Sequence, residues 1–318
     1  MKKIVVILIA TLALIMCLFA AGSAIGDTTP QMSLVPADAL WVLHFNMEKF
    51  TSSVMFKMLT EEGGLAALQR KGGEFVQKLK IDPFKDIQNV TVFGRGKEDE
   101  EPVVAVSGRF DKSYLLGLVK TETTHKEIPY GKHTIYNWDS DEFGVFASDN
   151  LILISEKEGE IKMALDAMEG KIQNILKSPL FGRLIDESRT AILVAATNDL
   201  SGLAGSRGGP VMLTKMRNAA GSLSEVGELM SIKINIGTES AQVAKEIEQA
   251  IRGLIAIVNL QVKDAEALAL TQSINIAVDG ESVRVEAAYP TLKLVQILKK
   301  RGALPHLSLD KFGPLSYY

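Results

Sequence analysis

Cysteine, histidine and the short motifs of enzyme chemistry are scarce in this sequence of 318 residues. The only cysteine, Cys17, lies in an apolar run near the N-terminus. A mature chain without that run has no cysteine, which excludes disulfides, thiolate catalysis and cysteine-based zinc sites. The 4 histidines stand at no metal-binding spacing from one another or from a carboxylate; they are His44, His125, His133 and His306.

Nucleotide-binding and hydrolase motifs are missing as well. The sequence has no Gly-x-Ser-x-Gly elbow and no phosphate-binding Gly-x-x-x-x-Gly-Lys. Residues 94–96 (Gly-Arg-Gly) lead into an acidic turn instead of a helix, so they cannot place a dinucleotide at a helix N-terminus. The net charge of −3 disfavours nucleic acid as a partner. We therefore predict no catalytic residue, no cofactor and no metal site, and a protein that is not an enzyme.

Residues 1–26 have the order of a secretory signal peptide. Lys2 and Lys3 form a short basic start, an unbroken apolar run covers residues 4–21, and small residues follow it. This order predicts export to the periplasm or the extracellular space. The alternative is an uncleaved segment that anchors the protein through residues 4–21, because that run approaches the length of a membrane span. Only this segment predicts contact with a membrane.

The rest of the chain is long enough to build a substantial core without disulfides. Apolar runs of strand length alternate with segments of helical spacing, and several strands form hairpins. This order predicts an α+β fold with antiparallel or mixed sheets and helices packed on one face. The pattern recurs in two similar lobes. The predicted segments are the signal peptide at 1–26, an extended leader at 27–33, the lobes at 34–171 and 178–301, and a tail at 302–318.

Three local signals indicate where helices and turns begin. Asp111 is placed to cap a helix, and residues 155–158 (Ser-Glu-Lys-Glu) have the form of a capping box. A long helix begins near Ser240 and continues into the 260s, with apolar residues at three- and four-residue spacing. Asp279-Gly280 predicts a tight hairpin turn between the last two strands.

Aromatic residues gather between positions 114 and 146 and supply the one candidate binding surface. On a strand, Tyr136 and Trp138 share one face while Ile135 points to the other. If Ile135 faces the core, the two aromatic rings are available to a partner. The alternative is that they lie beneath the next helix. The acidic pair nearby, Asp139 and Asp141, is read as a hairpin turn in preference to a calcium loop.

Two short phrases resemble a family of exported bacterial proteins with a domain of unknown function. The first is Val35-Pro36-Ala37-Asp38, followed by a strand, and the second is the stretch at 164–171 (Ala-Leu-Asp-Ala-Met-Glu-Gly-Lys). The resemblance is one of layout over most of the mature chain, and it implies no activity and no site residue.

The sequence therefore predicts an exported, non-enzymatic protein that acts by binding at the cell envelope. Its partner is an unidentified protein or envelope component. The alternative is a periplasmic carrier of an apolar ligand such as a lipid, held in a groove beside the long helix from Ser240, where methionines and aliphatic residues are plentiful. A hydrolase that uses Asp139 and Asp141 ranks last, because no base or nucleophile accompanies them.

Overall fold

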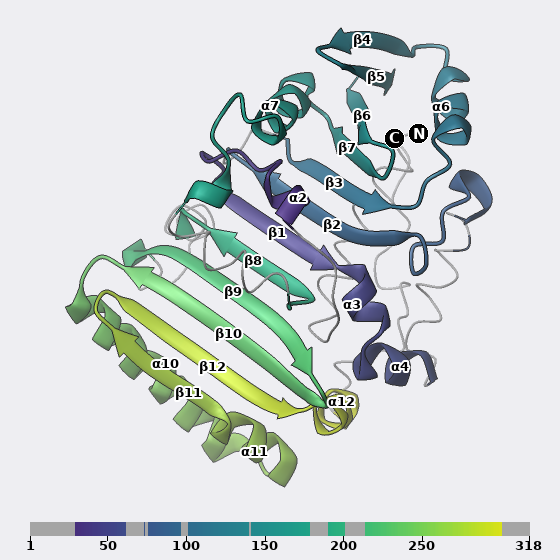
Figure 1. Cartoon of the computed structure of the whole chain (residues 1–318). Helices are drawn as coiled ribbons and strands as arrows, with labels where there is room; N and C mark the ends of the chain where they lie inside the picture. The colour runs from purple at the N-terminus through teal and green to yellow at the C-terminus, as the bar shows by residue number, and fades with distance from the viewer. Residues whose placement is uncertain are drawn as a thin grey trace, which may run out of the picture.

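The computed structural model describes residues 29–61, 73, 76–96, 101–139, 141–178, 190–200 and 214–300. Within them the chain forms a 12-stranded sheet in the order β11-β12-β10-β9-β8-β1-β2-β3-β7-β6-β5-β4 (Figure 1). All neighbouring strands of this sheet are antiparallel. With the helices that pack against the sheet, this confirms the predicted α+β fold.

Each half of the chain supplies one half of the sheet. The N-terminal half contains α2 (Thr29–Met32), β1 (Trp41–Asn46), α3 (Met47–Thr51), α4 (Val54–Glu61), β2 (Ile87–Gly94), β3 (Val103–Gly108), α6 (Lys112–Lys120), β4 (Lys126–Tyr130), β5 (His133–Asp139), β6 (Glu142–Ser148), β7 (Leu151–Ser155), α7 (Glu158–Met168) and the 3-10 helix η1 (Ile175–Lys177). The C-terminal half contains β8 (Leu193–Thr197), β9 (Met216–Val226), β10 (Leu229–Thr238), α10 (Ala241–Gln261), α11 (Ala265–Gln272), β11 (Ile274–Asp279), β12 (Ser282–Pro290) and α12 (Thr291–Lys300).

The two halves repeat one strand order. Outward from the centre, the N-terminal half runs β1-β2-β3-β7-β6 and the C-terminal half runs β8-β9-β10-β12-β11. In each half a helix follows the third strand, α6 after β3 and α10 after β10. The hairpin β4–β5 is an addition at the outer edge of the N-terminal half. Because β1 and β8 pair antiparallel at the centre, the two similar lobes share a single sheet.

Alternation along the strands gives the N-terminal half a core on each face of the sheet. On one face, Val42 and Leu153 pack with Ile161 and Leu165 of α7. On the other face, which we call the α6 face, Phe45 of β1 lies in a core with residues from three helices and from another strand of the same half: Met55 of α4, Leu115 of α6, Val295 of α12 and Val106 of β3. The N-terminal half therefore carries helices on both faces.

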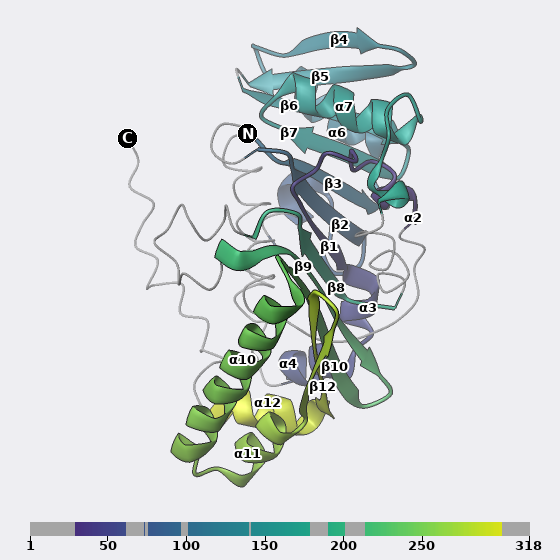
Figure 2. The same cartoon turned by 90° about the vertical axis from the view of Figure 1, so that its left-hand side faces the viewer.

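In the C-terminal half the long helix α10 covers the α6 face (Figure 2). Ile236 packs with α10 and points to the same side of β10 as Met230, which belongs to the core of the α6 face. Ser231, Lys233 and Asn235 alternate with these residues, so the opposite face of β10 is polar. Here the helices pack on one face, as predicted.

Several predicted helix ends are confirmed. The Asp111 carboxylate accepts a hydrogen bond from the backbone N–H of Tyr114 (2.9 Å), and the Ser240 hydroxyl accepts one from that of Val243 (3.3 Å). The helix from Ser240 runs to Gln261, as predicted, and Asp264 then caps α11 as a separate helix.

The predicted capping box at 155–158 is wrong. Ser155 is the last residue of β7 and is paired with Phe143 of β6, so its backbone belongs to the sheet. Its hydroxyl accepts a hydrogen bond from the N–H of Lys157 (3.2 Å), and α7 begins only at Glu158, without a side-chain cap.

The predicted leader and the predicted turn also differ from the structure. Residues of the leader form α2, in which Gln31 and Met32 are buried against the sheet, so this part of the leader is not extended. In the last hairpin, Asp279 pairs with Ser282, and the turn therefore consists of Gly280 and Glu281, one position later than predicted. Gly280 supplies the positive φ (57°) that this turn requires at its first central position. Strands β4 and β9 were not predicted.

The two outer strands of the sheet are protected differently. β4 carries Lys126 and Pro129, residue types that block strand addition. β11 has neither, but Arg252 of α10 donates a hydrogen bond to the carbonyl of Ile276 (2.8 Å). Residues of an antiparallel strand alternate in bonding direction, and the two-residue turn after Asp279 directs the Ile276 carbonyl away from β12. Arg252 thus occupies an acceptor that an added strand would use.

We expect Arg252→Ala to increase self-association, because it leaves this carbonyl available at an unprotected edge. Sedimentation velocity over a range of protein concentrations measures the effect. Arg284→Ala is the matched control, since Arg284 is an exposed arginine on β12 and its removal changes the net charge equally. Equal association of the two variants would show that Arg252 does not protect the edge.

No helix in the ranges given above is long and apolar enough to span a membrane. The predicted signal peptide at 1–26 lies outside the described residues. Export and the alternative of an N-terminal anchor both remain predictions.

Candidate ligand-binding pocket

An apolar pocket lies between α6 and the sheet in the N-terminal half. Its volume is about 440 Å³, within the range of roughly 300–1,000 Å³ that small-molecule sites occupy. Strands β2, β3, β5, β6 and β7 contribute to its lining. Apolar residues that represent each wall are Leu79, Leu118, Val119, Val106, Phe146 and Ile152. Polar side chains contribute a minority of the lining, and they include Lys78, Tyr114, Glu122 and Tyr136.

The helix above the pocket does not close onto the sheet. α6 is a regular helix, capped by Asp111 at its start and ended at Thr121. Its apolar residues Leu115, Leu118 and Val119 face the pocket, yet no residue of α6 is buried. The space beneath the helix accounts for this partial exposure.

The equivalent helix of the C-terminal half provides an internal comparison. α10 follows the third strand of its half, as α6 does, and covers the same face of the sheet. Its residues Ala244 and Ile247 are buried, and they pack with Ile276 and Val283 in a continuous core. The repeated topology therefore allows a helix in this position to pack tightly. The gap beneath α6 is a property of the N-terminal half and not of the fold.

Trp138 forms the end of the pocket at β5. It is buried (7% exposed), and its indole lies against Gly144 of β6, where a Cβ atom would come within 2.5 Å of the ring. Its indole N–H donates a hydrogen bond to the carboxylate of Glu142 (2.5 Å). Burial raises the pKa of Glu142 above its usual range, and the hydrogen bond from Trp138 partly offsets this effect. The glycine therefore makes room for the indole, and Glu142 fixes its orientation.

The predicted surface of Tyr136 and Trp138 becomes part of this pocket. Ile135 is fully buried on the face of α7, so the two aromatic residues point to the α6 face, as the alternation predicts. Both line the pocket. Trp138 lies beneath α6 and not on an open surface, while Tyr136 is half-buried.

The core of the C-terminal half fills the space beside the helix from Ser240, where the alternative function placed a groove. Ile247 is buried there, and Val243, Ile251 and Ile255 pack with it against the sheet. The pocket beneath α6 was not predicted. The sequence gives little indication of it, because a helix of nine residues with three leucines is typical of a helix packed on a core.

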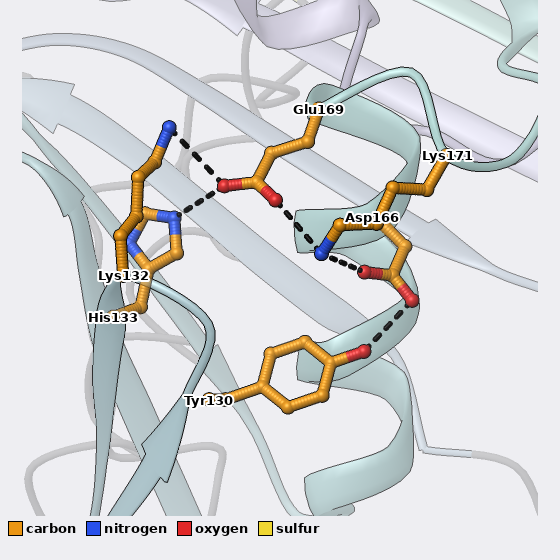
Figure 3. Close-up of polar contacts among 6 residues, drawn as sticks. All are labelled: Tyr130, Lys132, His133, Asp166, Glu169 and Lys171. Atoms are coloured by element: carbon orange, nitrogen blue, oxygen red, sulfur yellow. Dashed lines mark hydrogen bonds and ion pairs between the residues drawn. The ribbon is translucent and has the colours of Figure 1, made fainter.

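A polar cluster on the other face joins the β4–β5 hairpin to the end of α7 (Figure 3). Tyr130 donates a hydrogen bond to Asp166 (2.8 Å), and Lys171 bridges Asp166 and Glu169, at 2.9 Å from each. Glu169 also contacts two residues of the hairpin end, Lys132 (3.2 Å) and His133 (3.1 Å).

Glu169 and Tyr130 of this cluster do not exchange protons near neutral pH. Hydrogen bonds from Lys171, Lys132 and His133 lower the pKa of Glu169 to about 2. The hydrogen bond to Asp166 raises the pKa of Tyr130 above its usual value. Neither group is poised as an acid or base at pH 7, and the arrangement is that of a fastening between the hairpin and the helix.

The acidic pair Asp139 and Asp141 lies where a turn was predicted. Asp139 ends β5 and pairs with Glu142 at the start of β6, so the two strands form a tight hairpin. The described part of the chain holds no group of three or more histidine, cysteine, aspartate or glutamate residues that could bind a metal ion.

Comparison with known proteins identifies no family. No protein-family model and no curated protein matches the sequence. Among solved structures, crystal form I of TP0453 is similar in fold, with a TM-score of 0.48 and 11% identity over 87% of this chain and 98% of that chain. Crystal form III of TP0453 has a TM-score of 0.46 and 9% identity, over 85% and 97%. Values this low establish neither a shared family nor a shared function, and the resemblance to exported proteins of unknown function remains a prediction.

Proposed function

We propose that this chain is an exported, non-enzymatic protein that binds an apolar ligand in the pocket beneath α6. The observation that carries the proposal is a cavity of about 440 Å³, lined mainly by aliphatic and aromatic side chains, where the equivalent helix of the other half is tightly packed. A pocket of this kind exposes aliphatic and aromatic surface to water. Binding of an apolar molecule removes that surface from water, which supports a carrier or sensor role.

The pocket wall explains why an aromatic cluster lies on β5 and β6. Trp138 and Phe146 offer large flat surfaces to an apolar ligand at little cost in side-chain entropy. A ligand in contact with Trp138 changes its fluorescence. Only 2 tryptophans occur in the sequence, so Trp41→Phe isolates the Trp138 signal.

We expect the protein to bind the neutral dye N-phenyl-1-naphthylamine, and Val119→Trp to weaken this binding roughly tenfold or more. The larger side chain fills space that the ligand needs, and a tenfold change corresponds to about 1.4 kcal/mol. Val119 lines the pocket from α6. Fluorescence titration of the dye measures the dissociation constant.

Val258→Trp is the matched control, because Val258 is an exposed valine (41%) on α10, outside the pocket. Its dye affinity should equal that of the unaltered protein. If the protein binds no dye, or if both variants bind it equally, the pocket is not the ligand site.

A protein partner is the second candidate, favoured by a different surface. The outer side of α10 carries apolar residues that are largely exposed in the described chain: Leu254 (63% exposed), Ile257 (54%) and Leu260 (88%). Single exposed apolar residues are common, but a contiguous group of them is typical of interaction surfaces. A Leu254→Ser and Leu260→Ser double variant that still co-purifies with the same proteins as the unaltered chain would exclude this surface.

A further inference from the structure

The backbone of Lys80 is in a conformation that lysine rarely adopts. Its φ is 55°, in the left-handed region, and its N–H donates a hydrogen bond to the carbonyl of Val76 (3.0 Å), as in a helix C-cap. Glycine is the usual residue at such a cap, because any other L-residue is strained there. No other non-glycine residue in the described ranges has a positive φ. The local backbone therefore does not account for lysine at this position.

The side chain of Lys80 lies on the ring of Tyr114. Its ammonium is 3.9 Å from the centre of the Tyr114 ring, and this ring lines the pocket. The Tyr114 hydroxyl donates a hydrogen bond to the carbonyl of Lys78 (3.1 Å), so the ring is held in place. A cation above a ring is attracted to its negative face, which holds the ammonium next to a residue of the pocket lining.

No ion pair joins Lys80, or Lys78 of the pocket lining, to a carboxylate of the described chain, and Lys80 is the one of these two whose ammonium is held against a lining ring. Lys112 also lies over a lining ring, that of Phe146, but pairs with Asp149 (3.1 Å). Lys120, at the end of α6, pairs with Glu127 (2.9 Å). Lys80 therefore offers a fixed, available positive charge next to an apolar cavity.

We infer that the pocket binds a single-chain amphiphile with an anionic head, its chain beneath α6 and its head at Lys80. This inference rests on the proposed function and names its ligand class. Burial of the chain provides most of the affinity, since each methylene adds to it. One partly exposed ion pair contributes little, so Lys80 should favour an anionic over a neutral head by only about two- to fivefold.

Displacement of N-phenyl-1-naphthylamine by palmitate and by hexadecanol tests the inference, because the two probes share a chain and differ in charge. We expect palmitate to bind two- to fivefold more tightly than hexadecanol. Lys80→Gly should lower the affinity for palmitate to that for hexadecanol and leave the affinity for hexadecanol unchanged. Because glycine suits the left-handed backbone, the variant should retain its thermal stability, and this separates loss of charge from loss of fold.

Two further variants sharpen the test. Lys80→Met keeps the length and the backbone of the native residue, and it should lose the palmitate preference as Lys80→Gly does. Lys233→Ala removes an exposed lysine of β10 in the other half, and it should keep the preference. Palmitoyl lysophosphatidate extends the comparison to a phosphate head: tighter binding than palmitate would identify a lysophospholipid as the source of the anion.

The outcomes distinguish this inference from the proposed function. Equal binding of palmitate and hexadecanol, or a palmitate preference that survives Lys80→Gly, contradicts the role of Lys80 while the apolar site stands. Dye binding that neither amphiphile displaces excludes a single-chain ligand. Failure of the dye itself to bind removes the proposed function and the inference together.

Discussion

Gly108→Ala should lower the free energy of unfolding by about 3 kcal/mol, because a Cβ atom at this position meets backbone that cannot move aside. An ideal Cβ on Gly108 lies 2.2 Å from the carbonyl oxygen of Asp86. That oxygen accepts a hydrogen bond from the N–H of Arg109 (2.8 Å), and Gly108 itself donates to the carbonyl of Asn150 (2.9 Å). The alanine therefore forces β2 and β3 apart where β2 begins and β3 ends.

Gly117→Ala is the matched control and should have the opposite sign. Gly117 lies in α6, where nothing is within 4 Å of an added Cβ. Alanine is favoured over glycine inside a helix by about 1 kcal/mol, so this variant should be more stable by up to that amount. Urea denaturation followed by circular dichroism measures both. Similar stabilities for the two variants would mean that β2 and β3 do not approach as closely as described.

The unfolding free energy should fall by about 3 kcal/mol as the pH drops from 6.5 to 4, through a single histidine. His44 is fully buried on β1. Burial, with a smaller contribution from the charge of Lys49, lowers its pKa from 6.5 to about 4. Between these values the unfolded chain binds a proton that the folded chain does not, so stability increases with pH in this window. Above pH 6.5 the contribution is complete.

Hydrogen bonds define which nitrogen of His44 carries the proton. The Thr91 hydroxyl donates its only hydrogen to the side-chain oxygen of Gln31 (2.7 Å), so Nδ1 of His44 must donate to the Thr91 oxygen (2.8 Å). Nε2 is then an acceptor, and it is buried without a hydrogen-bond partner among the described residues. Protonation at Nε2 would place a charge in the core away from water, which is the main reason for the lowered pKa, and the charge of Lys49 adds a smaller contribution.

Urea denaturation at pH 7.5, 5.5 and 4.5 measures this dependence. His44→Gln removes the titrating group. Over this pH range the unfolding free energy of the variant should therefore fall by about 3 kcal/mol less than that of the unaltered protein. His125→Gln is the control, since His125 is only partly buried in the turn before β4, and this variant should follow the unaltered protein. A His44→Gln protein with an unchanged pH profile would place the titrating group elsewhere.

The candidate site was predicted in part. Alternation on β5 placed Tyr136 and Trp138 on one face, opposite Ile135, because strand geometry is local. Whether that face is open to a partner or covered by a helix depends on contacts between segments far apart in the sequence. The structure places Trp138 beneath α6, against a glycine of the neighbouring strand, and neither the Gly144 contact nor the available charge of Lys80 can be recognised from residue spacing.

The errors of prediction have the same origin. Residues 155–158 match a capping box, but pairing with β6 holds Ser155 in the sheet. The alternative function placed a groove beside the long helix from Ser240, because that helix is strongly apolar, and its apolar face is the filled core of the C-terminal half. A local pattern predicts that a surface will be buried but not what covers it.

The sequence by itself determined the strands and helices with strong periodicity, the caps at Asp111 and Ser240, and the α+β class, because each depends on residues within a few positions of one another. Tertiary structure alone decided that the two lobes share one sheet through β1 and β8, and that α6 stands away from the strands while α10 packs onto them. The pocket is the space left between segments far apart in the chain, so its existence depends on long-range packing that no local pattern encodes.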